Sequence, residues 1–403
     1  MSEKTVHLTN EQKNIADAFI DYAIGNKYGP YIAIAGYAGT GKTTVIGYVA
    51  AKLLAINRDF SIAYCAPTGK AASVMKKKLQ HFGGIGSRTI VSTIHCLIYD
   101  LVEERDDGKL VFGKRDNELY RDLIVVDEAS MVSDKMFNDL LSFNIPIIFI
   151  GDAGQLPPVE DKPFQPLIDT ELCLNTVHRQ ALNNPIINVA TRIRNGEEVA
   201  YGAIGDNFIR IKNTDPHKHM YLCNYADRIL DVDTVFLCNK NDTRIDVNTR
   251  IRNMLGFKNK LPMEGEILVC LKNNKNVDMF NGEFYKVVNG GEFYLDDTCY
   301  RLRLNNNVNT LAYTGSLNTP SNKLFAKKKA DWAKIMRNCK KANCKEPMYF
   351  DFGYVCTVHK AQGSEWDHVF MYNERNAYQT DDEFRQWQYT AITRAKETLC
   401  MAG

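Results

Sequence analysis

Short apolar runs alternate with helical patterns through the first part of the chain. Two of the helical patterns span Thr43–Leu54 and Lys70–His81. The apolar runs are rich in β-branched or aliphatic residues and lead into loops with Gly, Pro, Asp or Thr; they span Tyr31–Ala35, Ser61–Ala66, Leu123–Val126 and Pro146–Ile150. This alternation predicts a parallel sheet with crossover helices. Ligands of such sheets bind at the carboxyl ends of the strands, where these loops fall.

A second unit, beginning near Leu174, combines strands with an irregular insert. Three strands are expected at Thr234–Cys238, Tyr354–Val358 and His368–Tyr372. The insert covers about residues 257–350 and has alternating stretches between Asn- and Gly-rich turns, at Gly265–Leu271, Glu283–Val288, Glu292–Leu295 and Tyr300–Leu304. Alternation of this kind predicts a small antiparallel β-rich module, which we expect to be SH3-like.

The insert ends in a basic segment, Lys323–Lys345, which has nine Lys or Arg residues and one Asp. Apolar residues recur in it at helical spacing: Trp332, Ile335, Met336 and Cys339. Two interpretations stay open at this point. The segment is either a helix with a packed apolar face and a solvated basic face, or a helix whose basic face contacts a DNA backbone or a partner.

Composition limits the function without assigning it. A length of 403 residues allows two or three domains, and 45% hydrophobic with 24% charged residues is typical of a globular protein. The net charge is only +2, so any nucleic acid must be bound through local grooves and stacking. The 11 cysteines are scattered, and even the pair Cys339 and Cys344 lacks the further ligands of a zinc site.

The same composition favours a cytoplasmic location. Scattered cysteines without a CxxC pair favour reduced thiols over a disulfide framework. The segment Met1–Asn10 is polar, and no window of the sequence approaches the apolar length of a membrane span. We therefore expect no membrane partner.

The strongest chemical signal is the glycine-rich segment Gly36–Thr43, which reads GYAGTGKT. It follows an apolar strand and opens a helix, as a phosphate-binding loop requires. Glycines let backbone N–H groups turn toward phosphate, and the helix N-terminus adds partial positive charge. Lys42 is expected to meet the β- and γ-phosphates of ATP, and Thr43 to ligate Mg²⁺.

Two further strand ends carry residues suited to phosphoryl chemistry. The strand Leu123–Val126 leads into Asp127 and Glu128, which places one carboxylate near Mg²⁺ and a second near the attacking water. A third strand leads into Gly151–Pro158, where the amide of Gln155 can orient water or contact the γ-phosphate. Taken alone, each pattern is also typical of a solvated turn.

Together these loops give the chain a specific resemblance to superfamily 1 helicases of the RecD/Dda type. The helicase motifs match in order almost from end to end: Leu8–Gln12 (glutamine motif), Ala66–Ala72 (Ia), Ser92–His95 (Ib), Asp127–Met131 (II), Gly151–Pro158 (III), Thr176–Gln180 (IV), Thr357–Glu365 (V) and Tyr389–Ala395 (VI). The insert alone lacks distinctive signatures. The compact length resembles the phage Dda helicase more than the longer RecD-like enzymes.

The resemblance implies two RecA-like domains that use ATP and Mg²⁺. Arg179 and Arg394 would reach the γ-phosphate from the second domain, where a guanidinium neutralises developing charge. An exposed ion pair is the ordinary alternative for each arginine. The nucleotide-binding residues would be Gln12, Gly36, Gly39, Thr40, Gly41, Lys42, Thr43, Thr44, Gly363 and Glu365.

The resemblance also points to residues that face the DNA strand. These are Thr68, Lys70, Thr93, His95, Thr357 and His359. Short hydroxyl, Lys and His side chains suit phosphate contacts, which position a strand without reading its sequence. For either histidine taken singly, a structural role with satisfied hydrogen bonds is as good an interpretation.

A hairpin is predicted at Leu101–Lys114, where two short strands flank an Asp-Asp-Gly turn. Its place between motifs Ib and II matches the strand-separating pin of Dda-like helicases. Phe112 is then the aromatic side chain that would face the base pair at the fork. The alternative is an ordinary core phenylalanine.

The sequence therefore predicts an α/β protein with two RecA-like parallel-sheet domains. Domain 1A is expected at residues 1–173 with a hairpin insert at about 96–118, domain 2A at 174–256 and 351–403, and domain 2B at 257–350 with a basic helical segment at 323–345. The expected activity is ATP-driven unwinding, 5′ to 3′ by resemblance. A small-molecule kinase and a DNA-binding remnant without hydrolysis are the rival functions.

The resemblance implies the partners as well. We expect single-stranded DNA and forked or tailed duplex DNA as substrates of a monomer, with replication or recombination proteins as further partners.

Overall fold

In the computed structural model the described residues are 7–25, 29–104, 110–115, 119–158, 162–177, 184–212, 228–274, 277, 279–344 and 346–403. The chain forms two compact units. The first comprises Met1–Glu103 and Val111–Asn188, and the main part of the second is Val189–Gly403.

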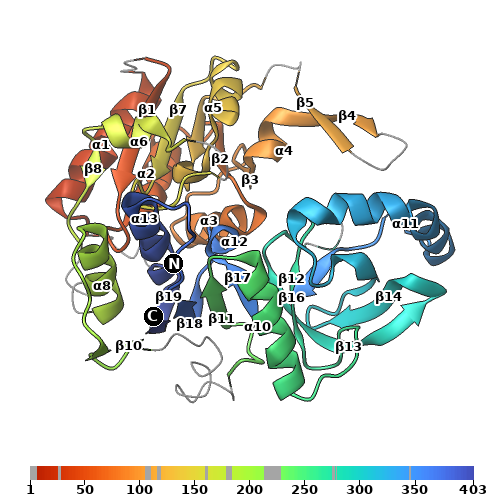
Figure 1. The fold of residues 1–403 in the computed structure, drawn as a ribbon. Helices are drawn as coiled ribbons and strands as arrows, with labels where there is room; N and C mark the ends of the chain where they lie inside the picture. Colours follow the sequence, from red (N-terminus) through yellow and green to blue (C-terminus); the bar gives the residue numbers. More distant parts are fainter. Residues whose placement is uncertain are drawn as a thin grey trace. The chain divides into compact units, whose positions relative to one another are not determined.

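The first unit is built on a six-stranded sheet whose strands are all parallel, in the order β3-β2-β6-β7-β1-β8 (Figure 1). The strands are β1 (Tyr31–Gly36), β2 (Ile62–Ala66), β3 (Ile90–Thr93), β6 (Leu123–Val126), β7 (Ile147–Gly151) and β8 (Cys173–Leu174). The four strands expected from apolar runs are confirmed. The two edge strands, β3 and β8, were not expected, because each is short and only partly buried.

Helices cover both faces of this sheet. One face carries α1 (Asn10–Ile24), α2 (Lys42–Ile56) and α3 (Gly69–His81), and the other carries α4 (Ile94–Ile98), α5 (Asp134–Leu141) and α6 (Gln165–Asp169). Tyr64 belongs to the first core and its neighbour Cys65 to the second. This division follows because successive side chains of a strand point to opposite faces of a sheet.

A two-stranded sheet of β4 (Tyr99–Glu104) and β5 (Leu110–Lys114) confirms the two strands of the predicted hairpin, whose Asp-Asp-Gly turn lies outside the described residues. Gly113 allows the strands to approach, because a Cβ at this position would lie 2.6 Å from Cγ2 of Val102. The base of the hairpin is held by Arg115, which donates to the carbonyl oxygen of Cys96 and pairs with Asp100 at 3.1 Å.

The second unit has its own six-stranded sheet, in the order β17-β11-β18-β19-β10-β9. Its strands are β9 (Gly202–Ile204), β10 (Phe208–Ile211), β11 (Thr234–Cys238), β17 (Val355–Thr357), β18 (Trp366–Tyr372) and β19 (Ala395–Ala402). All neighbours are parallel except β9 and β10. The helices of this part are α8 (Pro185–Arg194), α10 (Asn241–Met254), α12 (Val358–Ala361) and α13 (Asp381–Ile392). The three expected strands, and with them the α/β class, are confirmed.

The insert is a five-stranded antiparallel sheet in the order β15-β14-β13-β12-β16, with one long helix, α11 (Ser321–Ala342). Its strands are β12 (Ile267–Cys270), β13 (Phe284–Tyr294), β14 (Asp296–Leu304), β15 (Asn309–Tyr313) and β16 (Phe350–Phe352). The antiparallel module is confirmed. The stretches expected as separate at 283–288 and 292–295 form one strand, β13, because the Asn and Gly residues between them are accommodated as shifts in register and not as a turn.

Two buried ion pairs attach the insert to α10. Arg244 pairs with Asp351 of β16, and Arg252 pairs with Glu266 at 2.7 Å. The hydroxyl of Tyr354 also donates to Glu266, at 3.0 Å. Each of these four charged side chains is less than a tenth exposed, so the helix and the insert share a buried polar network.

The two compact units divide inside α8, between Asn188 and Val189. The strand β8 ends at Leu174 but belongs to the first sheet, and the first unit continues to Asn188 inside α8. The chain beyond β8 stays attached to the first unit, because the carboxylate of Glu11 accepts from the N–H groups of Asn175 and Thr176 at 2.9 and 3.0 Å.

Candidate functional site

The loop between β1 and α2 has the backbone that its glycines predict. Gly39 (φ 78°) and Gly41 (φ 84°) adopt left-handed conformations, which side chains other than glycine rarely tolerate. At Gly36 a Cβ would lie 2.9 Å from Cγ of Lys42, so the position needs glycine for space. Because α2 begins at Lys42, its N-terminus lies beside this loop, where partial positive charge favours an anion; the N–H of Thr44 already donates to the carbonyl oxygen of Gly41 at 2.9 Å.

Lys42 is held inside the loop by its backbone. Its ammonium group donates to the carbonyl oxygens of Gly36 at 2.6 Å and Tyr37 at 3.2 Å, and lies 4.0 Å from a carboxylate oxygen of Asp152. The side chain is 18% exposed. The charge therefore sits at the carboxyl end of β1, where an incoming phosphate can replace the carbonyl contacts.

Gln12 supports this loop from α1. Its side-chain amide donates to the carbonyl oxygen of Thr40 at 3.0 Å, and its side-chain oxygen accepts from the N–H of Thr9 at 3.1 Å. The hydroxyl of Thr9 accepts from the N–H of Gln12, which completes a capping box at the start of α1. The nitrogen of the amide thus connects the first helix to the phosphate loop, and its oxygen caps the start of that helix.

Asp127 and Glu128 follow β6 directly. Glu128 has a left-handed backbone (φ 54°), which is strained for a residue with a side chain and is typical of functional sites. Desolvation raises the pKa of Asp127, and this is opposed by the N–H of Glu128 and by the charges of Lys42 and Lys78. A cation at this carboxylate would favour its ionised form.

Gln155 lies beyond β7, beside the turn at Asp152. The carboxylate of Asp152 is fully buried and accepts from the N–H of Gly154 at 2.9 Å. Gln155 is 6% exposed, and its side-chain oxygen has no hydrogen-bond partner among the residues that the structure describes. A buried polar atom without a partner is costly in a folded protein, so a bound donor such as water fits here.

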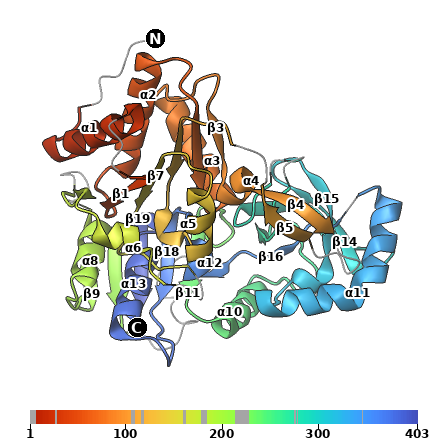
Figure 2. The ribbon, with the colours of Figure 1, turned by 90° about the horizontal axis from the view of Figure 1, so that it is seen from above.

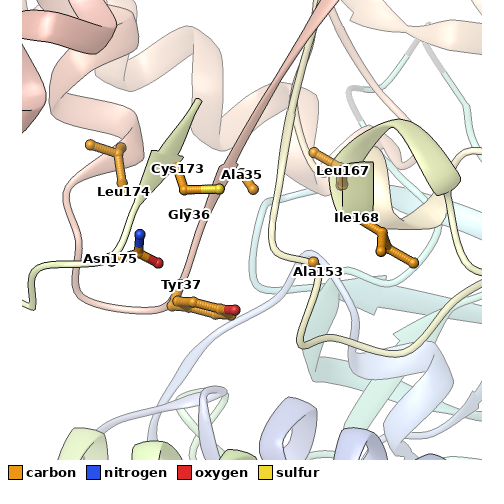
Figure 3. Close-up of a pocket in the computed structure, with 9 residues that line it drawn as sticks. All are labelled: Ala35, Gly36, Tyr37, Ala153, Leu167, Ile168, Cys173, Leu174 and Asn175. Atoms are coloured by element: carbon orange, nitrogen blue, oxygen red, sulfur yellow. The ribbon is translucent and has the colours of Figure 1, made fainter. Parts of the chain in front are cut away.

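A cavity of about 330 Å³ lies beside the phosphate loop, on the face of the sheet that carries α6. Figure 3 shows the side chains of Tyr37, Ile168 and Cys173 around it. Its wall also includes Gly36 and Ala153, which belong to the two loops described above. Open space therefore reaches the backbone of the loop that would hold phosphate.

Arg394 occupies a different environment in the second unit. It is 4% exposed, and its guanidinium donates to the carbonyl oxygens of Thr390 at 3.0 Å and Ser364 at 3.3 Å and to the hydroxyl of Thr393 at 3.0 Å. It therefore joins motif VI to motif V and is not an exposed ion pair. Arg179, the other predicted arginine, lies outside the described residues.

Two predicted nucleotide-binding residues lie in the same loop as Ser364. Gly363, two residues after the end of α12, takes a left-handed conformation (φ 71°), and Glu365 is exposed. The loop thus turns before β18 begins and leaves the side chain of Glu365 exposed to solvent.

Two predicted DNA contacts lie at one edge of the first sheet. Thr68 and Thr93 are the N-cap residues of α3 and α4, and their hydroxyls accept from the N–H groups of Ala71 and Cys96, both at 3.2 Å. Parallel pairing of Ala66 with Thr93 brings these two caps together. Each hydroxyl keeps its own proton to donate to a phosphate. Lys70 lies in the first turn of α3.

The two histidines favour their neutral forms. Partial desolvation and the nearby ammonium of Lys135 lower the pKa of His95, whose ring lies 5.2 Å from that of Tyr99. Burial lowers the pKa of His359, one residue into α12. Thr357, at the end of β17, is buried, with 6% exposed. These side chains can offer hydrogen bonds to a strand, but not a permanent charge.

Phe112 lies on β5 with 53% of its surface exposed. Leu101 and Val102, on the facing strand, are 52% and 69% exposed. Exposure of this extent contradicts the core alternative for Phe112. The hairpin thus presents apolar side chains to solvent.

Sequence reasoning missed Lys78, in the last turn of α3. Its ammonium group donates to the hydroxyl of Thr43 at 3.3 Å. A basic residue near the end of a helix is ordinary, so only the fold shows that α3 brings it to the phosphate loop. Asp152 was also not singled out, although its place directly after β7 was a usable signal.

Two family models match the chain. Residues 7–213 match a family described as AAA domain, and residues 352–402 match a UvrD-like helicase C-terminal domain. The first match covers more than half of the chain. Together the matches include every motif of the first sheet and the motifs that flank β18.

Curated relatives are similar over nearly the whole chain. The ATP-dependent RecD2 DNA helicase of Deinococcus radiodurans is 29% identical over 98% of this chain, which spans 49% of that protein. The ATP-dependent DNA helicase dda of Enterobacteria phage T4 is 25% identical over 96% of this chain and 98% of its own length. The chain thus spans about half of the first relative and almost all of the second.

A solved structure has the same fold. The Pif1 helicase from Bacteroides, in complex with ADP-AlF3 and single-stranded DNA, superposes with a TM-score of 0.54 at 17% identity, over 98% of this chain and 92% of that one. Within the described residues, none of the helices is both long and apolar enough to span a bilayer.

Proposed function

The chain belongs to the AAA domain family, and we propose that it is an ATP-dependent DNA helicase that moves 5′ to 3′ along single-stranded DNA. Its relatives group it with superfamily 1 helicases of the RecD/Dda type. The observation that carries the proposal lies in the first unit. The phosphate loop with Lys42, the carboxylates Asp127 and Glu128, and the unpartnered amide oxygen of Gln155 follow strands of one parallel sheet.

These residues divide the work of ATP hydrolysis. The N–H groups of Gly36–Thr43 and the ammonium of Lys42 bind the β- and γ-phosphates. Glu128 accepts the proton of the attacking water, and Gln155 orients that water with its amide. The left-handed backbone at Glu128 fixes where its carboxylate points.

Thr43 and Asp127 are the residues that would hold Mg²⁺. A hydroxyl and a carboxylate are oxygen ligands that this cation prefers, and it usually keeps several waters and takes few protein ligands. The fit is supported by Lys78, whose ammonium group donates to the Thr43 hydroxyl at 3.3 Å, so this oxygen already accepts from a cationic group. When bound, Mg²⁺ neutralises phosphate charge.

Arg394, together with Arg179, stabilises the charge that develops on the γ-phosphate. In this proposal Arg394 exchanges carbonyl partners for phosphate oxygens, which is favourable because charged pairs are the stronger hydrogen bonds. The exchange would release Ser364 and so alter the loop of Gly363 and Glu365, which in this proposal contacts the nucleotide sugar. Hydrolysis is thereby linked to motif V, which carries DNA contacts.

The DNA contacts are proposed to be independent of base sequence. Hydroxyl groups of Thr68, Thr93 and Thr357 bind phosphates, as do Lys70 and the neutral rings of His95 and His359. Gripping a backbone without reading bases suits a motor that must cross any sequence. The hairpin of β4 and β5 then acts as the pin, with Phe112 facing the first base pair of the duplex.

We further propose the domain division 1A (1–173), 2A (174–256 and 351–403) and 2B (257–350), a monomeric working form and a cytoplasmic location. Forked or tailed duplex DNA is the proposed substrate.

Duplexes of one sequence that carry only a 5′ or only a 3′ single-stranded tail test the proposal. With ATP and Mg²⁺, the protein should separate the 5′-tailed duplex and leave the 3′-tailed duplex annealed, while Lys42→Ala separates neither. Single-stranded DNA should accelerate ATP hydrolysis by the parent. If DNA does not change the rate of ATP hydrolysis and neither duplex is separated, the protein is a kinase-like ATPase instead. Separation of the 3′-tailed duplex alone would show that the protein moves 3′ to 5′ and would contradict the proposed direction.

A further inference from the structure

Helix α11 concentrates positive charge in a chain that is close to neutral. Its 22 residues include eight Lys or Arg and one Asp, whereas the whole chain has a net charge of +2. A segment this charged is expected to have a counterpart, either acidic neighbours in the fold or an anionic ligand.

Packing fixes which side of α11 faces outward. Ile335, Asn338 and Cys339 are at most 1% exposed and lie against the sheet of the insert, whose β14 and β15 contribute Cys299 and Tyr313 to the same core. The side chain of Asn338 donates to Asp296 and Thr298, both at 2.9 Å. Figures 1 and 2 show α11 lying beside the sheet of the insert, and these side-chain contacts fix which face of the helix packs against it.

Acidic neighbours neutralise only part of the positive charge of α11. Lys328 pairs with Glu346 at 2.7 Å, Arg337 with Asp296, and Lys334 with Asp297 at 3.9 Å. In the part of the chain that the structure describes, four exposed lysines have neither an ion pair nor a side-chain hydrogen bond: Lys323, Lys329, Lys340 and Lys341.

These four lysines form two rows along the outer face. Lys323 and Lys341 are five helical turns apart and share one side of this face, about 27 Å from end to end. Lys329 and Lys340 are three turns apart on the other side, about 16 Å from end to end. Between the rows stand the exposed alanines Ala326, Ala330 and Ala333, together with Arg337, which pairs with Asp296.

We propose that this outer face of α11 binds the phosphate backbone of double-stranded DNA. The helix is about 33 Å long, close to one turn of the B-form duplex at about 34 Å. Two parallel rows of cations match a groove bordered by two lines of phosphates. The proposal rests on the proposed helicase function in naming the duplex arm of a fork as the ligand.

Single-stranded DNA is a poorer match for this face. Binding of single strands combines positive charge with aromatic side chains on which bases stack. Among the side chains that the structure describes on the outer face, none is aromatic; Trp332 contributes to the core beneath the helix. A rigid helix with regular cations suits a ligand whose phosphates are equally regular.

The test replaces Lys323, Lys329, Lys340 and Lys341 together by alanine and measures binding without nucleotide. A matched control replaces four exposed lysines elsewhere in the second unit: Lys212, Lys258, Lys260 and Lys286. Affinity for a blunt 20-base-pair duplex and for a 20-nucleotide single strand is measured between about 50 and 200 mM salt. Each phosphate contact contributes roughly 0.9 to the slope of log affinity against log salt for duplex DNA.

The α11 variant should lose up to about 3.6 units of this slope for the duplex, about 0.9 for each of the four lysines, and at least tenfold in duplex affinity, with little change for the single strand. The control should keep the parental slope. Equal slopes in both variants would show that the face is only solvated, and an equal loss on single-stranded DNA would overturn the duplex assignment. Because no step needs ATP, the result stands apart from the tailed-duplex test of the helicase itself.

Discussion

Lys42 and Arg394, one in each unit, donate hydrogen bonds to backbone carbonyl oxygens, but they are held in different ways. Lys42 is 18% exposed, and the carbonyl groups that accept from it belong to its own loop. Arg394 is 4% exposed and connects three residues from two motifs. Lys42 is thus held by contacts within a single loop, whereas Arg394 is part of the packed interior of its unit.

The difference separates two ways of building a site. Where a cation belongs to one loop, its loss should remove chemistry and leave the fold intact. Where it also fills the interior, its loss should affect both. The following predictions use this contrast, from the largest effect to the smallest.

The largest effect is expected from Lys42→Ala and Arg394→Ala compared side by side. Both should reduce DNA-stimulated ATP turnover, by about 10³-fold or more for Arg394. Only Arg394→Ala should also destabilise the protein, by about 2 kcal/mol, because buried carbonyl groups lose a charged donor. For a unit of this size that is roughly 4–8 °C in Tm.

Turnover assays and thermal melts of both variants check this, with Arg250→Ala as an exposed control on α10. A Tm that falls equally for Lys42→Ala and Arg394→Ala would break the contrast between the two sites.

A smaller loss of activity is expected from Phe112→Ala. This side chain is exposed, so its removal should leave the fold intact. Duplex unwinding should slow by about tenfold, because stacking on an aromatic ring contributes about 1–3 kcal/mol per base. ATP turnover, single-strand affinity and Tm should stay near parental values. Leu101→Ala, on the facing strand, is the matched control. A fall in Tm together with a loss of unwinding, ATP turnover and single-strand affinity would show that Phe112 has a structural role.

The smallest effect concerns Asp296, an embedded carboxylate beneath α11. Although desolvation opposes ionisation, hydrogen bonds from Thr298, Asn338 and Arg337 lower the pKa of Asp296 to about 2. Asp296→Asn should therefore lower the free energy of unfolding by about 1 kcal/mol at pH 7. Asp297→Asn, whose side chain is 79% exposed, should have no measurable effect.

The pH dependence has a defined sign. A carboxyl group with a lowered pKa stabilises the fold above its unfolded value, near 4, and this contribution is lost as the pH falls toward 2. Urea unfolding curves should show a constant gap between parent and Asp296→Asn from pH 7 to about 5, which narrows below about 4. A gap that widens on acidification would contradict the assignment.

The position of the candidate site residues at the ends of strands was the part that the sequence could predict. Gly36–Thr43, Asp127 and Gln155 follow strands whose apolar runs are clear. Loops that follow parallel strands lie at the same edge of the sheet, where ligands bind. What depends on distant packing was not predictable. The burial of Arg394 against Ser364 and the arrival of Lys78 at Thr43 are set by the fold, and no spacing in the sequence encodes them.

The insert shows the same limit. Its antiparallel pairing followed from alternation, yet Asn289–Gly291 marks a shift in register within β13 where a turn was expected. The stripe at Ile335 and Cys339 correctly indicated a packed helical face. Which lysines remain unpaired depends on acidic residues elsewhere in the chain, such as Glu346, and only the folded structure reveals it.

The two arginines of α10 have a mechanical consequence. Arg244 and Arg252 form ion pairs with the insert at points about 12 Å apart along the helix axis. One anchor would act as a swivel, whereas two anchors resist torque. The insert should therefore turn with α10 as a single lever, and any tilt of that helix should be delivered undiminished to the lysine rows of α11.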